Sequence, residues 1–146
     1  MKKIPTAVAA IGFAIAISGC SEAPNNEFEA RSGDQEYDQT VGMASDLRAA
    51  GEPCADFSIN DVATYARESA TCTLDGHEVI LSVFESTEDQ AANVQNFADI
   101  NEPVRMEYGL LVGSKWMINC GDTTTSETCV NLQAKLGGEL VKPNYG

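Results

Sequence analysis

The sequence has a single histidine, His77, and this scarcity limits the enzyme classes that the chain can serve. Acyl transfer needs a base that titrates near neutral pH, and histidine is the usual one. His77 directly follows Asp75-Gly76, a dipeptide typical of a tight turn, where a side chain is normally solvated. No Gly-x-Ser-x-Gly nucleophile motif is present either. We therefore predict no catalytic residue and interpret the chain as non-enzymatic.

Other common site patterns are also missing from the sequence. It has no Cys-x-x-Cys pair or His-Glu-x-x-His run for zinc, and no glycine-rich phosphate loop. The oxygen-rich run 122–127 lacks the alternating acidic ligands and the glycine of an EF-hand calcium loop. Helix capping by Thr124 and Glu127 explains this run without a metal. We therefore expect neither a metal site nor a cofactor.

Basic residues are few, nine against 22 acidic ones, which gives a net charge of −13. Such a surface repels phosphates and anionic lipid head groups, so it argues against nucleic acid binding and peripheral lipid binding. The simplest interpretation of the excess acid is solubility beside an anionic envelope.

The longest apolar run extends from Ile4 to Ile17 and follows Lys2 and Lys3. It is too short to span a bilayer core, which needs about 20 residues. A short apolar run behind basic residues is typical of a cleaved export signal. The run closes with Ile17-Ser18-Gly19-Cys20, a branched apolar residue, two small residues and a cysteine. This motif resembles the lipobox of bacterial lipoproteins.

The resemblance implies that residues 1–19 are removed as a lipoprotein signal peptide. It also implies that Cys20 carries diacylglycerol on its sulfur and, in some members, an acyl chain on its amino group. Two or three acyl chains, at about 0.8 kcal/mol per buried CH₂, hold a protein at a membrane lastingly. An ordinary secretory signal with a chance cysteine is the alternative. We expect a lipid-anchored protein on the extracytoplasmic face of the cell membrane, with an unidentified envelope protein as its further partner.

Loss of Lys2 and Lys3 with the signal leaves seven basic against 22 acidic residues, a net charge of −15. Residues 20–39 are polar and acidic, which predicts a flexible tether behind the lipidated cysteine. Such a coil of about 20 residues would hold a domain roughly 25 Å from the lipid. Phe28 and Tyr37 are the tether side chains that are able to dock onto the domain. A single globular domain is expected over residues 40–146.

Four cysteines remain besides Cys20, an even set that suits disulfides in an exported chain. Three pairings are open, and sequence neighbours close short loops most easily. We therefore expect bonds Cys54–Cys72 and Cys120–Cys129.

Periodicity and turn residues divide the domain into alternating helices and strands. Helices are expected at Thr40–Ala50, from a capping box at Ser86 to Asn101, and along Cys129, Leu132, Leu136 and Leu140. Strands are expected at Cys54–Ile59, Thr71–Leu74, His77–Phe84, Tyr108–Val112 and Lys115–Cys120. These elements predict an α+β fold, a small antiparallel sheet of about four to five strands with two or three helices on one face, stapled by disulfides. The layout resembles small uncharacterised lipoproteins of high-G+C Gram-positive bacteria, a resemblance that implies no activity.

Three aromatic side chains are candidates for a contact surface: Tyr65, Tyr108 and Trp116. Tyrosine and tryptophan are enriched at binding hot spots. For Trp116, a place in the core beneath a helix is the preferred interpretation, and an exposed contact residue is the alternative. The sequence thus predicts a non-enzymatic interaction or binding domain. The alternative is a small-ligand carrier, or an enzyme whose site is assembled from residues far apart in the sequence.

Overall fold

A computed structural model describes residues 27–121 and 126–145. Its six-stranded sheet has the order β1-β2-β3-β5-β4-β6, and all neighbouring strands are antiparallel. The strands are β1 (Ala55–Ile59), β2 (Glu68–Leu74), β3 (His77–Val83), β4 (Leu110–Val112), β5 (Trp116–Asn119) and β6 (Glu139–Val141). The helices are α1 (Thr40–Ala49), α2 (Thr87–Asn101) and α3 (Ser126–Leu136), with a 3₁₀ turn η1 (Glu102–Val104) after α2. The predicted α+β class is confirmed, with one strand more than expected.

The β2–β3 hairpin lies inside the sheet, and β3 is one of its two central strands. Leu74 pairs with His77, which leaves Asp75-Gly76 as a two-residue turn. Both turn residues have positive φ, 49° and 81°, as a type I′ turn requires. The side chains of Val79 and Leu81 on β3 are fully buried, because this strand has neighbours on both sides and a helix-covered face.

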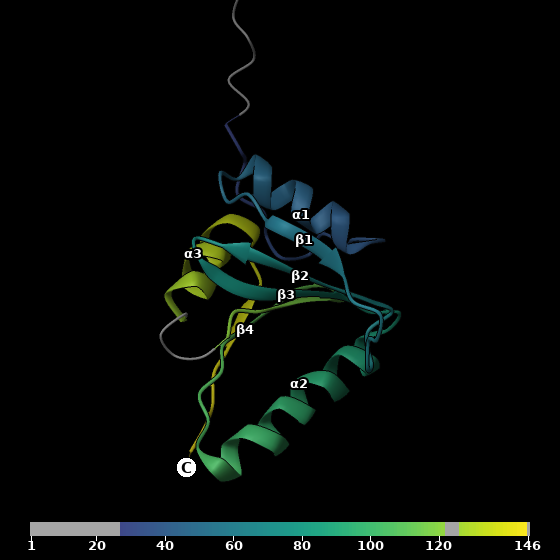
Figure 1. Cartoon of the computed structure of the whole chain (residues 1–146), viewed down its shortest axis with the longest axis vertical. Coiled ribbons are helices and arrows are strands. Elements are labelled where there is room, and N and C mark those ends of the chain that lie inside the picture. Colours follow the sequence, from purple (N-terminus) through teal and green to yellow (C-terminus); the bar gives the residue numbers. More distant parts are fainter. Residues whose placement is uncertain (1–26, 122–125, 146) are drawn as a thin grey trace, which may run out of the picture.

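Helices lie on both faces of the sheet (Figure 1). Neighbouring residues of a strand point to opposite faces, so Trp116 and Ile118 join a core with α1 and α3, while Met117 joins a smaller core with α2. The predicted arrangement of two or three helices on one face therefore holds for α1 and α3, whereas α2 lies on the opposite face. The reason is local: Phe84 belongs to the smaller core, and α2 begins at Thr87, so the chain enters α2 on that face.

The end of α3 differs from the expected helical line through Leu140. The helix stops at Leu136, because Gly137 and Gly138 adopt positive φ of 72° and 93°. The next residues form β6, in which Leu140 pairs with Leu111 of β4. A strand of three residues carries too little alternation to be recognised in the sequence.

Residues 28–39, called the strap from here on, lie against the domain. The Arg31 N–H donates to the Lys135 carbonyl oxygen at 2.8 Å, and the Ser114 N–H donates to the Gly33 carbonyl oxygen at 2.9 Å. Phe28 packs against the larger core. The prediction of a flexible tether up to Gln39 was wrong for this part, because backbone hydrogen bonds and aromatic burial offset its polar composition. The packed domain begins at Phe28 rather than at Thr40, and residues 20–26 lie outside the described part.

Two glycines allow the strap to approach the end of α3. A Cβ atom on Gly33 would lie 2.4 Å from the Gly138 nitrogen, and one on Gly137 would lie 2.3 Å from the Ser32 carbonyl carbon. Both glycines also have positive φ, 91° and 72°. Any side chain at either position would push the strap away from the domain.

Both predicted disulfides are confirmed. Cys54–Cys72 joins the segment before β1 to β2, and Cys120–Cys129 joins the end of β5 to α3, with Cα–Cα distances of 5.4 and 5.7 Å. Within residues 27–121 and 126–145, no helix combines the length and the apolar character that a bilayer crossing needs.

Candidate binding groove

The three predicted contact residues lie in different places. Trp116 is 0% exposed and Tyr108 is 4% exposed, so the prediction that they form a contact surface was wrong. Both rings belong to residues in or beside the inner strands β4 and β5, where helices cover the sheet. Tyr65 is 43% exposed on the loop between β1 and β2. Of the three, only Tyr65 is available for contact.

Tyr108 holds the far end of α2 against the sheet. Its ring lies 6.0 Å from that of Phe97, and its hydroxyl donates to the Glu102 carboxylate at 3.1 Å. Burial, together with this hydrogen bond, raises the pKa of Tyr108 to about 12. The residue stays neutral at physiological pH and acts as a structural contact.

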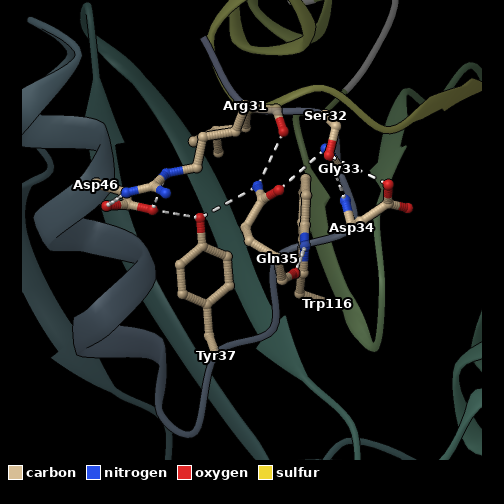
Figure 2. Close-up of polar contacts among 9 residues, drawn as sticks. Arg31, Ser32, Gly33, Asp34, Gln35, Tyr37, Asp46 and Trp116 are labelled. Atoms are coloured by element: carbon tan, nitrogen blue, oxygen red, sulfur yellow. Dashed lines mark hydrogen bonds and ion pairs between the residues drawn. The ribbon is translucent and has the colours of Figure 1, made fainter. Parts of the chain in front are cut away.

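The Trp116 side chain lies against the strap residues Gln35 and Tyr37 (Figure 2). Its indole N–H donates to the Gln35 carbonyl oxygen at 2.9 Å, and its ring meets Tyr37 edge-on at 6.0 Å. The preferred interpretation of Trp116 as a core residue is therefore confirmed.

A polar network completes the attachment of the strap. Arg31 pairs with Asp46 of α1 at 2.8 Å, and the Tyr37 hydroxyl donates to the same carboxylate at 2.7 Å. The Gln35 side-chain amide donates to the Leu136 carbonyl oxygen at 2.9 Å. Burial raises the pKa of Tyr37, and the hydrogen bond to Asp46 raises it further. Because these groups are engaged with one another, we interpret the network as a structural joint.

The other candidates considered in the sequence form no site within the described residues. His77 is exposed at the tip of the β2–β3 hairpin. Residues 122–125, including the capping residue Thr124, lie outside the described part, and so does Cys20. Among the residues that are described, no three or more His, Cys, Asp or Glu side chains are grouped to hold a metal ion.

A groove of about 130 Å³ lies between α2 and the sheet face that α2 covers, and we call it the α2 groove. The loop before β2 forms its outer wall. Its lining comprises Val62, Ala63, Thr64, Ala66, Ser69, Ile80, Ser82, Asn93, Phe97, Met117 and Asn119. None of these side chains is ionisable. The groove therefore offers hydroxyl groups, amides and apolar surface, and its lining has no group for general acid–base chemistry.

Ser82 is the most unusual residue of the groove. It lies on β3 between Leu81 and Val83, whose side chains are buried in the larger core on the other face. Ser82 is 4% exposed, and its hydroxyl makes no hydrogen bond to the described part of the chain. Among the described residues no buried side-chain nitrogen or oxygen lacks a partner, so this hydroxyl is accessible from the groove. Its hydrogen-bonding capacity at the floor of the groove is therefore open to a partner.

Further polar groups of the groove are only partly used. The Asn93 side chain on α2 has no hydrogen-bond partner among the described residues. The amide oxygen of Asn119 accepts a hydrogen bond from the Gly121 N–H at 2.9 Å. The NH₂ group of Asn119 remains available to donate. Ser69 accepts from Asn60 at 3.0 Å and keeps its own hydroxyl proton for donation. The groove thus combines donors and acceptors that protein contacts do not saturate.

Sequence reasoning missed this groove because its lining comes from four separate segments. The available signal was Ser82, a polar residue inside the apolar strand from Val79 to Phe84. A hydroxyl in an inner strand needs a hydrogen-bond partner or access to solvent. The backbone groups of β3 are already paired with β2 and β5, so they are not available to the hydroxyl.

Two more hollows, of about 190 and 370 Å³, adjoin the strap. The first is lined by strap residues 29–35, and the second lies between the strap, the β4–β5 turn and the glycines after α3. They follow from the close docking of the strap, whereas the α2 groove presents an accessible hydroxyl that makes no hydrogen bond to the described residues. We therefore take the α2 groove as the candidate site. No protein-family model, no curated protein and no solved structure matches the chain.

Proposed function

We propose that the protein is a lipid-anchored lipoprotein whose single domain binds a partner outside the cytoplasmic membrane without catalysing a reaction. One observation carries the binding role: the α2 groove presents the Ser82 hydroxyl, which makes no hydrogen bond to the described residues, in a lining without ionisable side chains. A partner that supplies hydrogen bonds to this surface is bound more tightly. The lining has no side chain that acts as a general acid or base.

The volume of the groove favours a macromolecular partner over a small ligand. Sites for small molecules usually enclose about 300–1,000 Å³. The α2 groove, at about 130 Å³, has room for roughly one side chain of a partner that lies across it. We therefore prefer an interaction domain to the alternative of a small-ligand carrier.

The anchoring role is supported by the lipobox resemblance of residues 17–20 and by the strap. The strap fixes the chain to the domain from Phe28 onward, so only residues 21–27 separate Cys20 from the packed domain. At about 3.6 Å per residue, this connection reaches roughly 25 Å at full extension. The two disulfides agree with an exported location, since such bonds persist in oxidising compartments.

Substitution of the lipobox cysteine tests the anchor. Cells that express the full chain are fed a labelled fatty acid, and the protein is recovered from membrane and soluble fractions. The wild-type protein should carry label and stay with the membrane, whereas Cys20→Ala should carry none and leave the membrane fraction. Ser21→Ala, which keeps the four lipobox residues, is the matched control and should behave as wild type.

Equal labelling and membrane retention of Cys20→Ala would show that the lipobox interpretation is wrong. The binding role would then need another explanation for how the domain reaches its partner, but the chemistry of the α2 groove would be unchanged.

A further inference from the structure

We infer that the α2 groove binds an extended peptide segment of an envelope protein, with a small apolar side chain in the groove and basic residues beside it. The inference rests on the binding role proposed above and adds the chemical class of the partner. Three features support it: the neutral polar groups of the groove, its apolar floor and the charges around it.

The polar groups of the groove match a peptide backbone. A backbone presents one donor and one acceptor per residue, both neutral. The Ser82 hydroxyl and the Asn93 amide each donate and accept, and the Asn119 NH₂ group donates. A peptide that crosses the groove can satisfy all three.

The hydrogen bonds have to come from side chains rather than from an added strand. β3 pairs with β2 on one side and β5 on the other, so its backbone groups are already used. The peptide would therefore lie across the face of the sheet, between α2 and the loop before β2. Its single inserted side chain would rest on the apolar floor formed by Ile80, Phe97 and Met117.

The charges near the groove select a basic partner. α2 contains no Lys or Arg, and its Asp89 lies four residues, about one helical turn, before the groove residue Asn93. Asp61 directly precedes the groove residue Val62. Arg67 directly precedes β2, and Lys115 directly precedes β5. Each cation forms an ion pair, Arg67 with Glu85 at 3.5 Å and Lys115 with Glu36 at 3.2 Å.

The carboxylates of Asp61 and Asp89 and the net charge of −13 attract cations and repel an anionic polymer. A neutral glycan would normally lie against an aromatic ring in the site. The aromatic residue of the lining, Phe97, is packed against the smaller core, and the exposed Tyr65 of the neighbouring loop is not part of the lining. Chemistry and charge together favour a basic peptide segment, and a glycan becomes an outcome of the test.

The inference is tested with the full lipidated protein in detergent micelles. The probe is a library of hexapeptides that are acetylated at the amino end and amidated at the carboxyl end. Selection should enrich Lys or Arg on either side of Ala, Val or Thr, and the affinity of enriched peptides should fall as salt is added. Chitotetraose serves as the glycan probe and should not compete.

Two substitutions locate the binding in the groove. Ser82→Ala removes the groove hydroxyl with little change in volume, and Asn93→Ala removes the helix amide; each should weaken peptide binding at least about threefold. Alanine favours a helix more than asparagine, so loss of binding in Asn93→Ala cannot arise from unfolding of α2. The matched controls are Ser58→Ala on the exposed β1 and Gln95→Ala on the outer side of α2, and both should bind as wild type.

Three results would overturn the inference: no enriched peptide, enrichment of acidic peptides, or binding that survives both groove substitutions. Competition by chitotetraose would overturn it in favour of a glycan. None of these results bears on the fatty-acid labelling of Cys20, so failure of the peptide inference and failure of the anchor are separate outcomes.

Discussion

Trp116→Ala is expected to lower the free energy of unfolding by about 3–5 kcal/mol and to release the strap. The indole is fully buried, and its N–H donates to the Gln35 carbonyl oxygen at 2.9 Å. The ring also supports Tyr37, and it fits because Gly113 has no side chain: a Cβ atom there would lie 2.0 Å from the indole. Truncation removes core packing and the strap contact together.

Denaturant unfolding followed by far-ultraviolet circular dichroism measures the loss, since the substitution removes the only tryptophan fluorophore. Limited trypsin digestion reports on the strap, because Arg31 is held by Asp46 in the docked state. Trp116→Phe is the control: it keeps an aromatic ring, loses the hydrogen bond and should cost about 1–2 kcal/mol. An unfolding free energy within 1 kcal/mol of wild type, with Arg31 still protected, would contradict the account of the strap.

Removal of the Cys54–Cys72 disulfide by the double substitution Cys54→Ala and Cys72→Ala should cost about 3 kcal/mol. The bond closes a loop with a sequence separation of 18 and lies in the larger core. The matched double substitution of Cys120 and Cys129 opens a separation of only 9, so it should cost about 2.5 kcal/mol. Alanine is preferred to serine because it leaves no unpaired hydroxyl in the core.

Equilibrium unfolding of both double variants gives the two values under one set of conditions. We expect both variants to fold and both to be destabilised. The Cys54–Cys72 variant should have the lower free energy of unfolding. A Cys54–Cys72 variant as stable as wild type would show that this bond does not staple the domain.

The fold class could be predicted because its strongest signals are local. The Asp75-Gly76 turn needs two residues with positive φ, and the dipeptide supplies them. The helix α2 begins where Ser86 accepts a hydrogen bond from the Asp89 N–H at 3.1 Å, as its capping pattern indicates. Disulfide pairing also followed from short loop closure.

The strap and the groove could not be predicted because both depend on contacts between distant segments. The strap is polar, and its order comes from Trp116 and from the end of α3, which lie far along the chain. The side of the sheet on which α2 packs decides whether Ser82 lies under a helix or in solvent. Neither composition nor periodicity contains that information.

The strap also changes the role of the tether. Deleting residues 25–39 would remove Phe28 and Tyr37 from their contacts with the larger core, so such a deletion would damage the domain as well as shorten the segment behind Cys20. With the lipid that we propose on Cys20, residues 21–27 would connect it to the domain, and the domain would act close to the membrane surface.

The most direct measurement of the central claim is site-specific photocrosslinking in intact cells. A benzoylphenylalanine is placed at Val62, an 80% exposed residue at the rim of the α2 groove, or at Val41, a 49% exposed residue on α1. The account predicts a discrete crosslinked envelope protein from Val62 and none from Val41, with the product reduced by Ser82→Ala, abolished by Cys20→Ala and unchanged by His77→Ala. Equal products from Val62 and Val41, or a Val62 product that persists in Ser82→Ala and disappears in His77→Ala, would contradict it.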